Sequence, residues 1–146
     1  MLKLFKNPSL ITRIATGKLL GLIIGLIGFF ILPAIYPGST LMLQFAFLLW
    51  YATFGAIIAV FGVFTYHPVL KVPMPWWFRS SLIGAWLNFV LTLFIYDQLQ
   101  FMIFNFFGEN SIIQSPFWFV FEGAIMGLFI EYYCKKWGGE GKETIK

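Results

Sequence analysis

The chain has 146 residues and a formal net charge of +4; 60% of its residues are hydrophobic, 21% are aromatic and 11% are charged. Soluble globular domains carry about 25% charged residues, so this composition excludes a soluble domain as well as a disordered chain and a disulfide framework. One cysteine and one histidine leave almost nothing with which to build a metal site, and no cofactor is expected. The composition predicts one all-α integral membrane domain over residues 1–146, with the lipid bilayer as its surroundings.

Basic and apolar residues alternate over residues 2–15, ahead of the first long apolar run. This pattern suits a short helix on the inner membrane surface, and a frayed cationic tail is an equal alternative. The basic segment and the apolar run after it resemble the two parts of a signal peptide, but residues 33–37 form no small-residue cleavage site. The first apolar run is therefore predicted to be a retained membrane span.

Four apolar runs are long enough to cross a bilayer, since about 20 apolar residues span the hydrocarbon core as a helix. The predicted spans cover about residues 18–35, 41–66, 80–104 and 112–133. The connections between them are rich in proline, glycine, serine or asparagine, which favour turns. The sequence thus predicts a bundle of four transmembrane helices.

Positive charge is confined to alternate connections. The ten Lys and Arg residues precede or begin the first span, occupy the second connection or follow the fourth span. Because cations are retained on the cytoplasmic side of short loops, both termini are predicted to be cytoplasmic. This asymmetry and the short loops suit a bacterial inner membrane. The net charge follows from the topology and from attraction to anionic headgroups, so no nucleic-acid partner is expected.

The chain contains an internal similarity. Residues 50–61 align without a gap on residues 118–129, a shift of 118 − 50 = 68, with Trp, Gly, Ala, Ile and Phe coinciding. Residues 17–21 align more weakly on residues 80–84. Because each copy would hold two spans, the alignment predicts two parallel-related helical hairpins, a 2+2 repeat about an axis along the membrane normal. Chance similarity between apolar helices is the alternative.

Small residues recur at intervals of four within the spans, and such stripes let helix backbones approach closely. The residues predicted to pack helices together are Gly21, Gly25, Gly55, Gly123 and Gly127. Packing within one chain is favoured over a dimerisation face, which stays the alternative.

Two carboxylates fall at membrane depth: Asp97 in the third span and Glu122 in the fourth. A buried ionisable group is costly in a membrane without a partner, so such a residue suggests a functional site. Asn88 belongs to a polar stripe at residues 84, 88, 92 and 96 and can donate to a carboxylate. Asp97, Glu122 and Asn88 are the candidate proton- or cation-binding residues. Under the alternative, Asp97 marks the outer end of the third span and Glu122 is buried alone, hydrogen-bonded to a neighbouring helix.

Trp76, Trp77 and Arg79 place aromatic rings beside a cation at the inner end of the third span. This combination is typical of an interfacial anchor. Glu131 and Lys135 are four residues apart, which predicts an ordinary ion pair on a helix surface.

The sequence has no Ser/His/Asp set, no HExxH motif, no cysteine pair and no phosphate loop, so an enzyme is not expected. A non-catalytic structural or accessory subunit, or an assembly partner of a membrane complex, is the favoured function, because polar groups are scarce. The alternative is a homo-oligomer that conducts or transports protons or cations through an embedded carboxylate. The expected partners are copies of this chain or other membrane proteins.

Overall fold

The computed structural model describes residues 8–146 and is helical in all its regular elements. The elements are α1 (Leu10–Ile35), α2 (Leu41–Phe61), α3 (Trp76–Phe94), α4 (Tyr96–Phe107), α5 (Trp118–Gly138) and a C-terminal 3-10 helix η2 (Gly141–Ile145). Ser9 caps α1 by accepting from the backbone N–H of Thr12. Residues 10–15 of the expected surface segment therefore belong to α1, and its residues 2–7 lie outside the described part of the chain.

Three helices, α1, α2 and α3, are long and apolar enough to cross a membrane. With 26, 21 and 19 residues they reach about 39, 31 and 28 Å at about 1.5 Å per residue. The expectation of a helical membrane protein is confirmed to this extent. The fifth helix, α5, has 21 residues but also carries two glutamates and two lysines.

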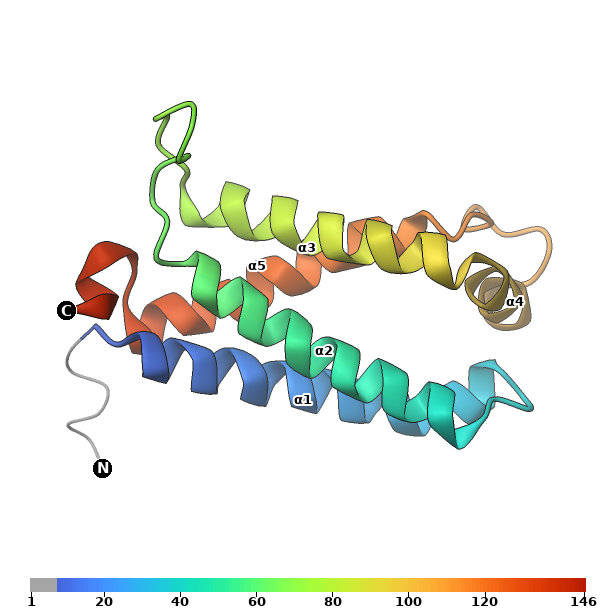
Figure 1. Ribbon diagram of the computed structural model, residues 1–146. Coiled ribbons are helices and arrows are strands. Elements are labelled where there is room, and N and C mark those ends of the chain that lie inside the picture. The colour runs from blue at the N-terminus through green and yellow to red at the C-terminus, as the bar shows by residue number, and fades with distance from the viewer. Residues whose placement is uncertain (1–7) are drawn as a thin grey trace.

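The helices lie in two pairs, α1 beside α2 and α3 beside α5 (Figure 1). The start of α1, the loop between α2 and α3 and the C-terminal turn gather at one end of the molecule, and the α1–α2 turn and α4 lie at the other. The described Lys and Arg residues occur in four places. These are the first three turns of α1, the α2–α3 loop with the start of α3, the last turn of α5, and the C-terminal segment. Positive charge is thus concentrated at the end that holds the start of α1 and the C-terminal turn.

The third predicted span is not one helix. It breaks at Ile95, whose φ of −124° and ψ of 34° are not helical, and α4 leaves α3 at a steep angle (Figure 1). Polar residues follow the break: residues 96–98 and 100 are Tyr, Asp, Gln and Gln, and they begin where α3 has already covered about the thickness of the hydrocarbon core. As a separate amphipathic helix, α4 buries Leu99 and Met102 and leaves its polar face outside.

The other predicted boundaries also shift. The fourth helix begins at Trp118 instead of residue 112, because the segment before it forms turns that end with the backbone N–H of Trp118 donating to Ser115. The second helix ends at Phe61 instead of residue 66, and Gly62 follows it as the cap.

Glycines bring the paired helices into backbone contact. A Cβ atom added to Gly21 or Gly25 would collide with the α2 backbone at Tyr51 or Leu48, and one added to Gly55 would collide with the backbone of Gly17. In the other pair, Gly123 meets the Gly84 carbonyl and the Asn88 side chain, and Gly127 meets Ser80. All five glycines predicted to pack helices therefore lie at contacts within the chain.

Candidate functional site

The Glu122 carboxylate of α5 is held by side chains from two other helices. The Tyr51 hydroxyl of α2 lies 3.0 and 2.9 Å from the two carboxylate oxygens and donates to the carboxylate. The Asn88 amide of α3 donates to Glu122 Oε2 at 2.6 Å. Gly123 allows Asn88 to come close to Glu122. Because Gly123 has no side chain, the Asn88 side chain lies against the α5 backbone. The structure thus brings together two of the three predicted site residues.

Asn88 is fully buried, and its side-chain amide nitrogen and oxygen both form hydrogen bonds. Its amide nitrogen also donates to the Phe119 carbonyl at 3.0 Å, and its oxygen accepts from the Trp50 indole at 3.2 Å. The Thr92 hydroxyl, one turn further along α3, donates to the Asn88 carbonyl at 2.7 Å. Since an unpaired buried amide would cost several kcal/mol, this network is a strong tie between α2, α3 and α5.

Glu122 also borders an apolar groove between α4 and α5. The groove has a volume of about 450 Å³, and its walls include Leu99, Met102, Phe107 and Met126. A second apolar groove of about 320 Å³ reaches Tyr51 from the α1 side of α4. The hydrogen-bonded Glu122 and Tyr51 pair thus lies where two apolar grooves approach each other beneath α4.

Asp97 does not join this site. It lies in the first turn of α4, beyond the break at Ile95, and its side chain is exposed. A carboxylate there is favoured by the helix dipole, which places partial positive charge at the N-terminus of α4. Within residues 8–146, no hydrogen bond or ion pair joins Asp97 to Glu122, so the predicted pair of neighbouring carboxylates is not formed.

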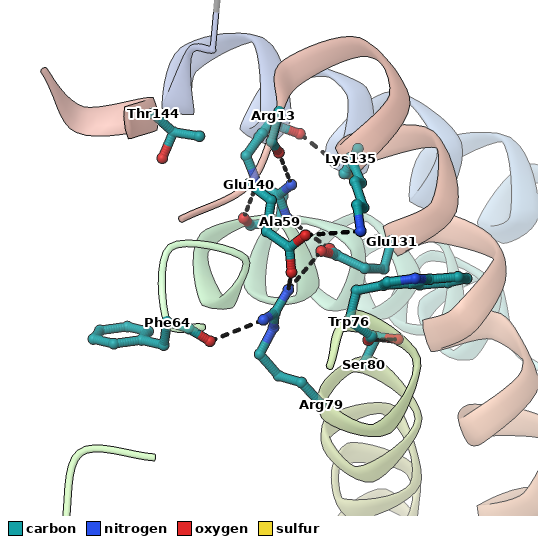
Figure 2. Close-up of polar contacts among 12 residues, drawn as sticks. Arg13, Ala59, Phe64, Trp76, Arg79, Ser80, Glu131, Lys135, Glu140 and Thr144 are labelled. Atoms are coloured by element: carbon teal, nitrogen blue, oxygen red, sulfur yellow. Dashed lines mark hydrogen bonds and ion pairs between the residues drawn. The ribbon is translucent and has the colours of Figure 1, made fainter. Parts of the chain in front are cut away.

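A second polar cluster, not expected from the sequence, ties the helices together at the end that holds the start of α1 and the C-terminal turn (Figure 2). Glu131 of α5 accepts from Arg13 of α1 at 2.6 Å through Oε2 and from Arg79 of α3 at 2.9 Å through Oε1. The three side chains are at most 2% exposed. We call Arg13, Arg79 and Glu131 the buried ion cluster. It joins three helices through one carboxylate.

The Arg13 guanidinium fits into a cradle of backbone atoms. Its Nε donates to the Ala59 carbonyl of α2 at 2.9 Å, and its Nη1 donates to the Gly139 carbonyl in a short contact. Gly62 and Gly138 flank the side chain, and a Cβ at either position would overlap it. Arginine suits this cradle because its planar fork of five N–H donors can serve several acceptors at fixed angles.

Arg79 connects the same cluster to the loop before α3. Its Nη1 donates to the Phe64 carbonyl at 2.9 Å and to the Met74 carbonyl at 3.3 Å, and its Nη2 also contacts Glu140 at 3.1 Å (Figure 2). Arg79, predicted to be an interfacial anchor, has a buried side chain that binds protein groups. Of the two aromatic anchors, Trp77 is exposed and Trp76 is partly covered.

The predicted Glu131–Lys135 pair is wrong. Glu131 turns inward to the two arginines, and Lys135 pairs instead with Glu140 at 2.9 Å. Burying two guanidiniums costs far more than exposing one lysine, so the carboxylate lies where it compensates them. The signal that could have found this cluster is residue type: the chain has only two arginines, at positions 13 and 79, and both are in it.

Glu140 lies at the edge of the ion cluster and outside the long helices. Burial of its carboxyl raises its pKa, but hydrogen bonds from Lys135 and Arg79 outweigh this effect and lower the pKa of Glu140 below its ordinary value of 4.5. The bonded form is the ionised carboxylate, so its protonation would weaken the contacts that hold the C-terminal segment.

This lowered pKa predicts an acid-dependent contribution to stability. A carboxyl with a lower pKa in the folded state stabilises the fold above its unfolded pKa, and the stabilisation is lost as the pH falls through the folded pKa. We expect Glu140→Gln to reduce the free energy of unfolding by about 1 kcal/mol or less near pH 7, since the group is partly exposed, and to have no effect below both pKa values. Thermal unfolding of both proteins between neutral and acid pH tests this. A difference that stays constant across that range would contradict it.

No group of three or more His, Cys, Asp or Glu side chains that could hold a metal ion occurs in residues 8–146. Cys134 is buried, and its thiol lies 3.5 Å from the Arg13 carbonyl. The chain matches no protein-family model, no curated protein and no solved structure.

Proposed function

We propose that this protein is a non-catalytic multi-pass membrane protein that serves as a structural or accessory subunit, or as an assembly partner, of a membrane complex. The observation that carries the proposal is how its buried polar side chains are used. Glu131, Arg13 and Arg79 bind one another and backbone carbonyls, and Asn88 binds three groups from other helices. These polar groups hold the helices of the chain together, as a structural subunit requires.

The proposed topology has four spans, with α5 as the fourth and with both termini in the cytoplasm of a bacterial cell. Its support is the concentration of Lys and Arg at one end of the molecule, which matches the retention of cations on the cytoplasmic side. The charged residues of α5 do not oppose a span. Glu131 is compensated by two arginines, and Lys135 and Lys136 lie in the last turns, where lysines extend to the interface.

The proposed 2+2 repeat has support in the helix contacts. Gly17 meets Gly55 in the first helix pair, and Gly84 meets Gly123 in the second. If one contact is placed on the other, Gly17 of α1 corresponds to Gly84 of α3, a shift of 84 − 17 = 67, and Gly55 of α2 corresponds to Gly123 of α5, a shift of 123 − 55 = 68. The two shifts agree within one residue. The weaker sequence alignment placed Gly21 over Gly84, so the contact geometry favours a register four residues different for the first and third spans.

The surface available to partners is apolar and aromatic. Large side chains on the outer faces of α1 and α3 are exposed, among them Leu19, Ile27, Phe30, Trp86 and Phe94. In a membrane such faces contact lipid tails or the helices of another protein. A scaffold needs this kind of surface, and the bundle offers it on several sides.

Native mass spectrometry of the protein extracted gently from its own membrane tests the proposal. Stable co-purification with a larger complex of other membrane proteins is the expected result, and the partner would define the complex. A discrete homo-oligomer without other proteins would contradict the accessory role and favour the alternative below.

The alternative function is a homo-oligomer that moves protons or cations with Glu122. One observation favours it: within residues 8–146 the carboxylate contacts neutral donors only, Tyr51 and Asn88, and it borders a groove. A carboxylate without a fixed counter-ion can exchange a proton or a cation. Its partners on α2 and α3 would keep it oriented in both states.

Glu122→Gln tests the alternative. Glutamine keeps the shape and still accepts from Tyr51 and Asn88, so we expect normal insertion and a loss of unfolding free energy of about 1 kcal/mol or less. Under the alternative, proton or cation flux into liposomes is abolished, whereas Glu109→Gln, in the turn before α5, leaves flux unchanged. Under the accessory role, the unmodified protein shows only background flux, and neither variant changes it. Gross instability of Glu122→Gln would indicate a packing role for this residue.

A further inference from the structure

The loop between α2 and α3 and the C-terminal turn enclose a pocket at the end that holds the start of α1. The pocket has a volume of about 600 Å³, and its lining includes Val63, His67, Pro68, Lys71, Lys142 and Ile145. It is separate from Glu122 and borders the buried ion cluster at Phe64, whose carbonyl accepts from Arg79, and neither proposed function uses it. Its lining residues include two lysines and one histidine, and no Asp or Glu of residues 8–146, and most of its surface is apolar.

The two walls of the pocket are held together by specific backbone contacts. The Gly141 N–H donates to the Gly62 carbonyl at 2.9 Å, which docks the C-terminal turn on the loop. Gly139 and Gly141 have φ values of 77° and 79°, which only glycine adopts easily, and they turn the chain back after α5. Lys71 and Lys142, which are 71 residues apart, thereby line one pocket.

The loop that forms the other wall is also ordered by its own bonds. The backbone N–H groups of Val69 and Leu70 donate to His67 Nδ1 at 3.2 and 3.0 Å, and the His67 N–H donates to the Val72 carbonyl at 2.9 Å. Because Nδ1 accepts, the neutral imidazole carries its proton on Nε2, which is left to donate to a ligand. Lys71 has a φ of 52°, the left-handed region that a non-glycine residue occupies at a cost.

The pocket lies beside the ends of two candidate membrane spans. Its loop begins directly after α2 ends at Phe61 and finishes directly before α3 starts at Trp76, so it lies where these two helices would leave the hydrocarbon. Val69 and Leu70 at its tip are 78% and 66% exposed. Apolar side chains beside lysines at this depth suit the boundary between acyl chains and headgroups.

We propose that this pocket binds the phosphate headgroup of an anionic phospholipid. Lys71 and Lys142 neutralise the phosphate, and His67 Nε2 donates a hydrogen bond to one of its oxygens. Val63, Pro68 and Ile145 cover the glycerol and the first part of the acyl chains. A volume of about 600 Å³ is roughly twenty times that of a water molecule, which leaves room for a headgroup. The site works the same way under either function proposed above.

Lipid retention measured by native mass spectrometry tests the site. The full chain is placed in nanodiscs of phosphatidylglycerol and phosphatidylcholine and then released into detergent, and the lipids that stay bound are identified. The pocket variant carries Lys71→Asn, because asparagine tolerates a positive φ, and Lys142→Gln. The matched control carries Lys18→Gln and Lys136→Gln, which remove the same charge from exposed positions outside the pocket. Thermal unfolding of each variant verifies that it is folded.

We expect the protein to retain phosphatidylglycerol in preference to phosphatidylcholine, the pocket variant to lose this retention about tenfold, and the control to stay within about twofold of the unmodified protein. Equal losses in the two variants would overturn the proposal, because attraction to the general positive charge would then explain them. Equal retention of the two lipids by the unmodified protein would overturn it as well. Displacement of the lipid by millimolar inorganic phosphate would show that free phosphate, and not a lipid, is the ligand.

Discussion

Glu131→Gln is expected to destabilise the protein more than any other single substitution that keeps the size of the side chain. The change leaves Arg13 and Arg79 buried without the carboxylate that compensates both. Removing one partner from a buried ion pair costs about 3–5 kcal/mol, because the remaining charge stays out of water. Glu131 compensates two charges, so we expect a loss at the upper end of this range. Thermal unfolding in detergent, followed by the fluorescence of the six tryptophans, measures it.

Glu143→Gln is the matched control for this substitution. Glu143 lies in η2 and is exposed, and the same neutralisation there is expected to change the free energy of unfolding by less than about 0.5 kcal/mol. If Glu131→Gln were as stable as its control, the buried ion cluster would contribute nothing to holding α1, α3 and α5 together.

Gly55→Ala is expected to separate α1 from α2. The added methyl group would overlap the carbonyl of Gly17, which is backbone and cannot rotate away. The helices must therefore move apart along their glycine contacts, and such overpacking costs about 1–3 kcal/mol. Thermal unfolding measures the loss, and cross-linking between cysteines placed on α1 and α2 reports the separation.

Gly28→Ala in α1 is the control, since a Cβ there meets nothing within 4 Å. Alanine is the better helix former, so this variant is expected to be as stable as the unmodified protein or more stable by about 0.5–1 kcal/mol. The pair also separates packing within the chain from dimerisation. If Gly55→Ala altered the oligomeric state and left unfolding unchanged, the glycine stripe would be a dimer interface.

The glycine contacts show how much local pattern can predict. Spacing by four puts Gly21 and Gly25 on one helix face whatever the rest of the fold does, and both meet α2. The same rule put Asn88 on the polar face of its helix, and Asn88 binds Glu122. These features were predictable because helical periodicity alone determines which residues share a face.

Asp97 shows what local pattern leaves open. The sequence allowed it either to join Glu122 in one site or to mark the outer end of the third span, and in the structure the helix ends at Phe94 and α4 carries Asp97 out of the bundle. The polar residues that follow the break were visible in the sequence. Whether a helix bends or ends at such residues depends on what its next turn can pack against, and here Leu99 and Met102 pack in a cluster with Leu32, Phe47 and Tyr51.

The sequence by itself determined that this is a helical membrane protein, which glycines pack its helices and which end of the bundle carries the positive charge. Composition and helical periodicity act over a few residues, so these properties do not depend on the final fold. Only the tertiary structure decided that both arginines share Glu131, because Arg13 and Glu131 are 118 residues apart and meet only when three helices and the C-terminal turn are assembled. No local pattern encodes such a contact. It forms because two buried guanidiniums are costly unless a carboxylate compensates their charge.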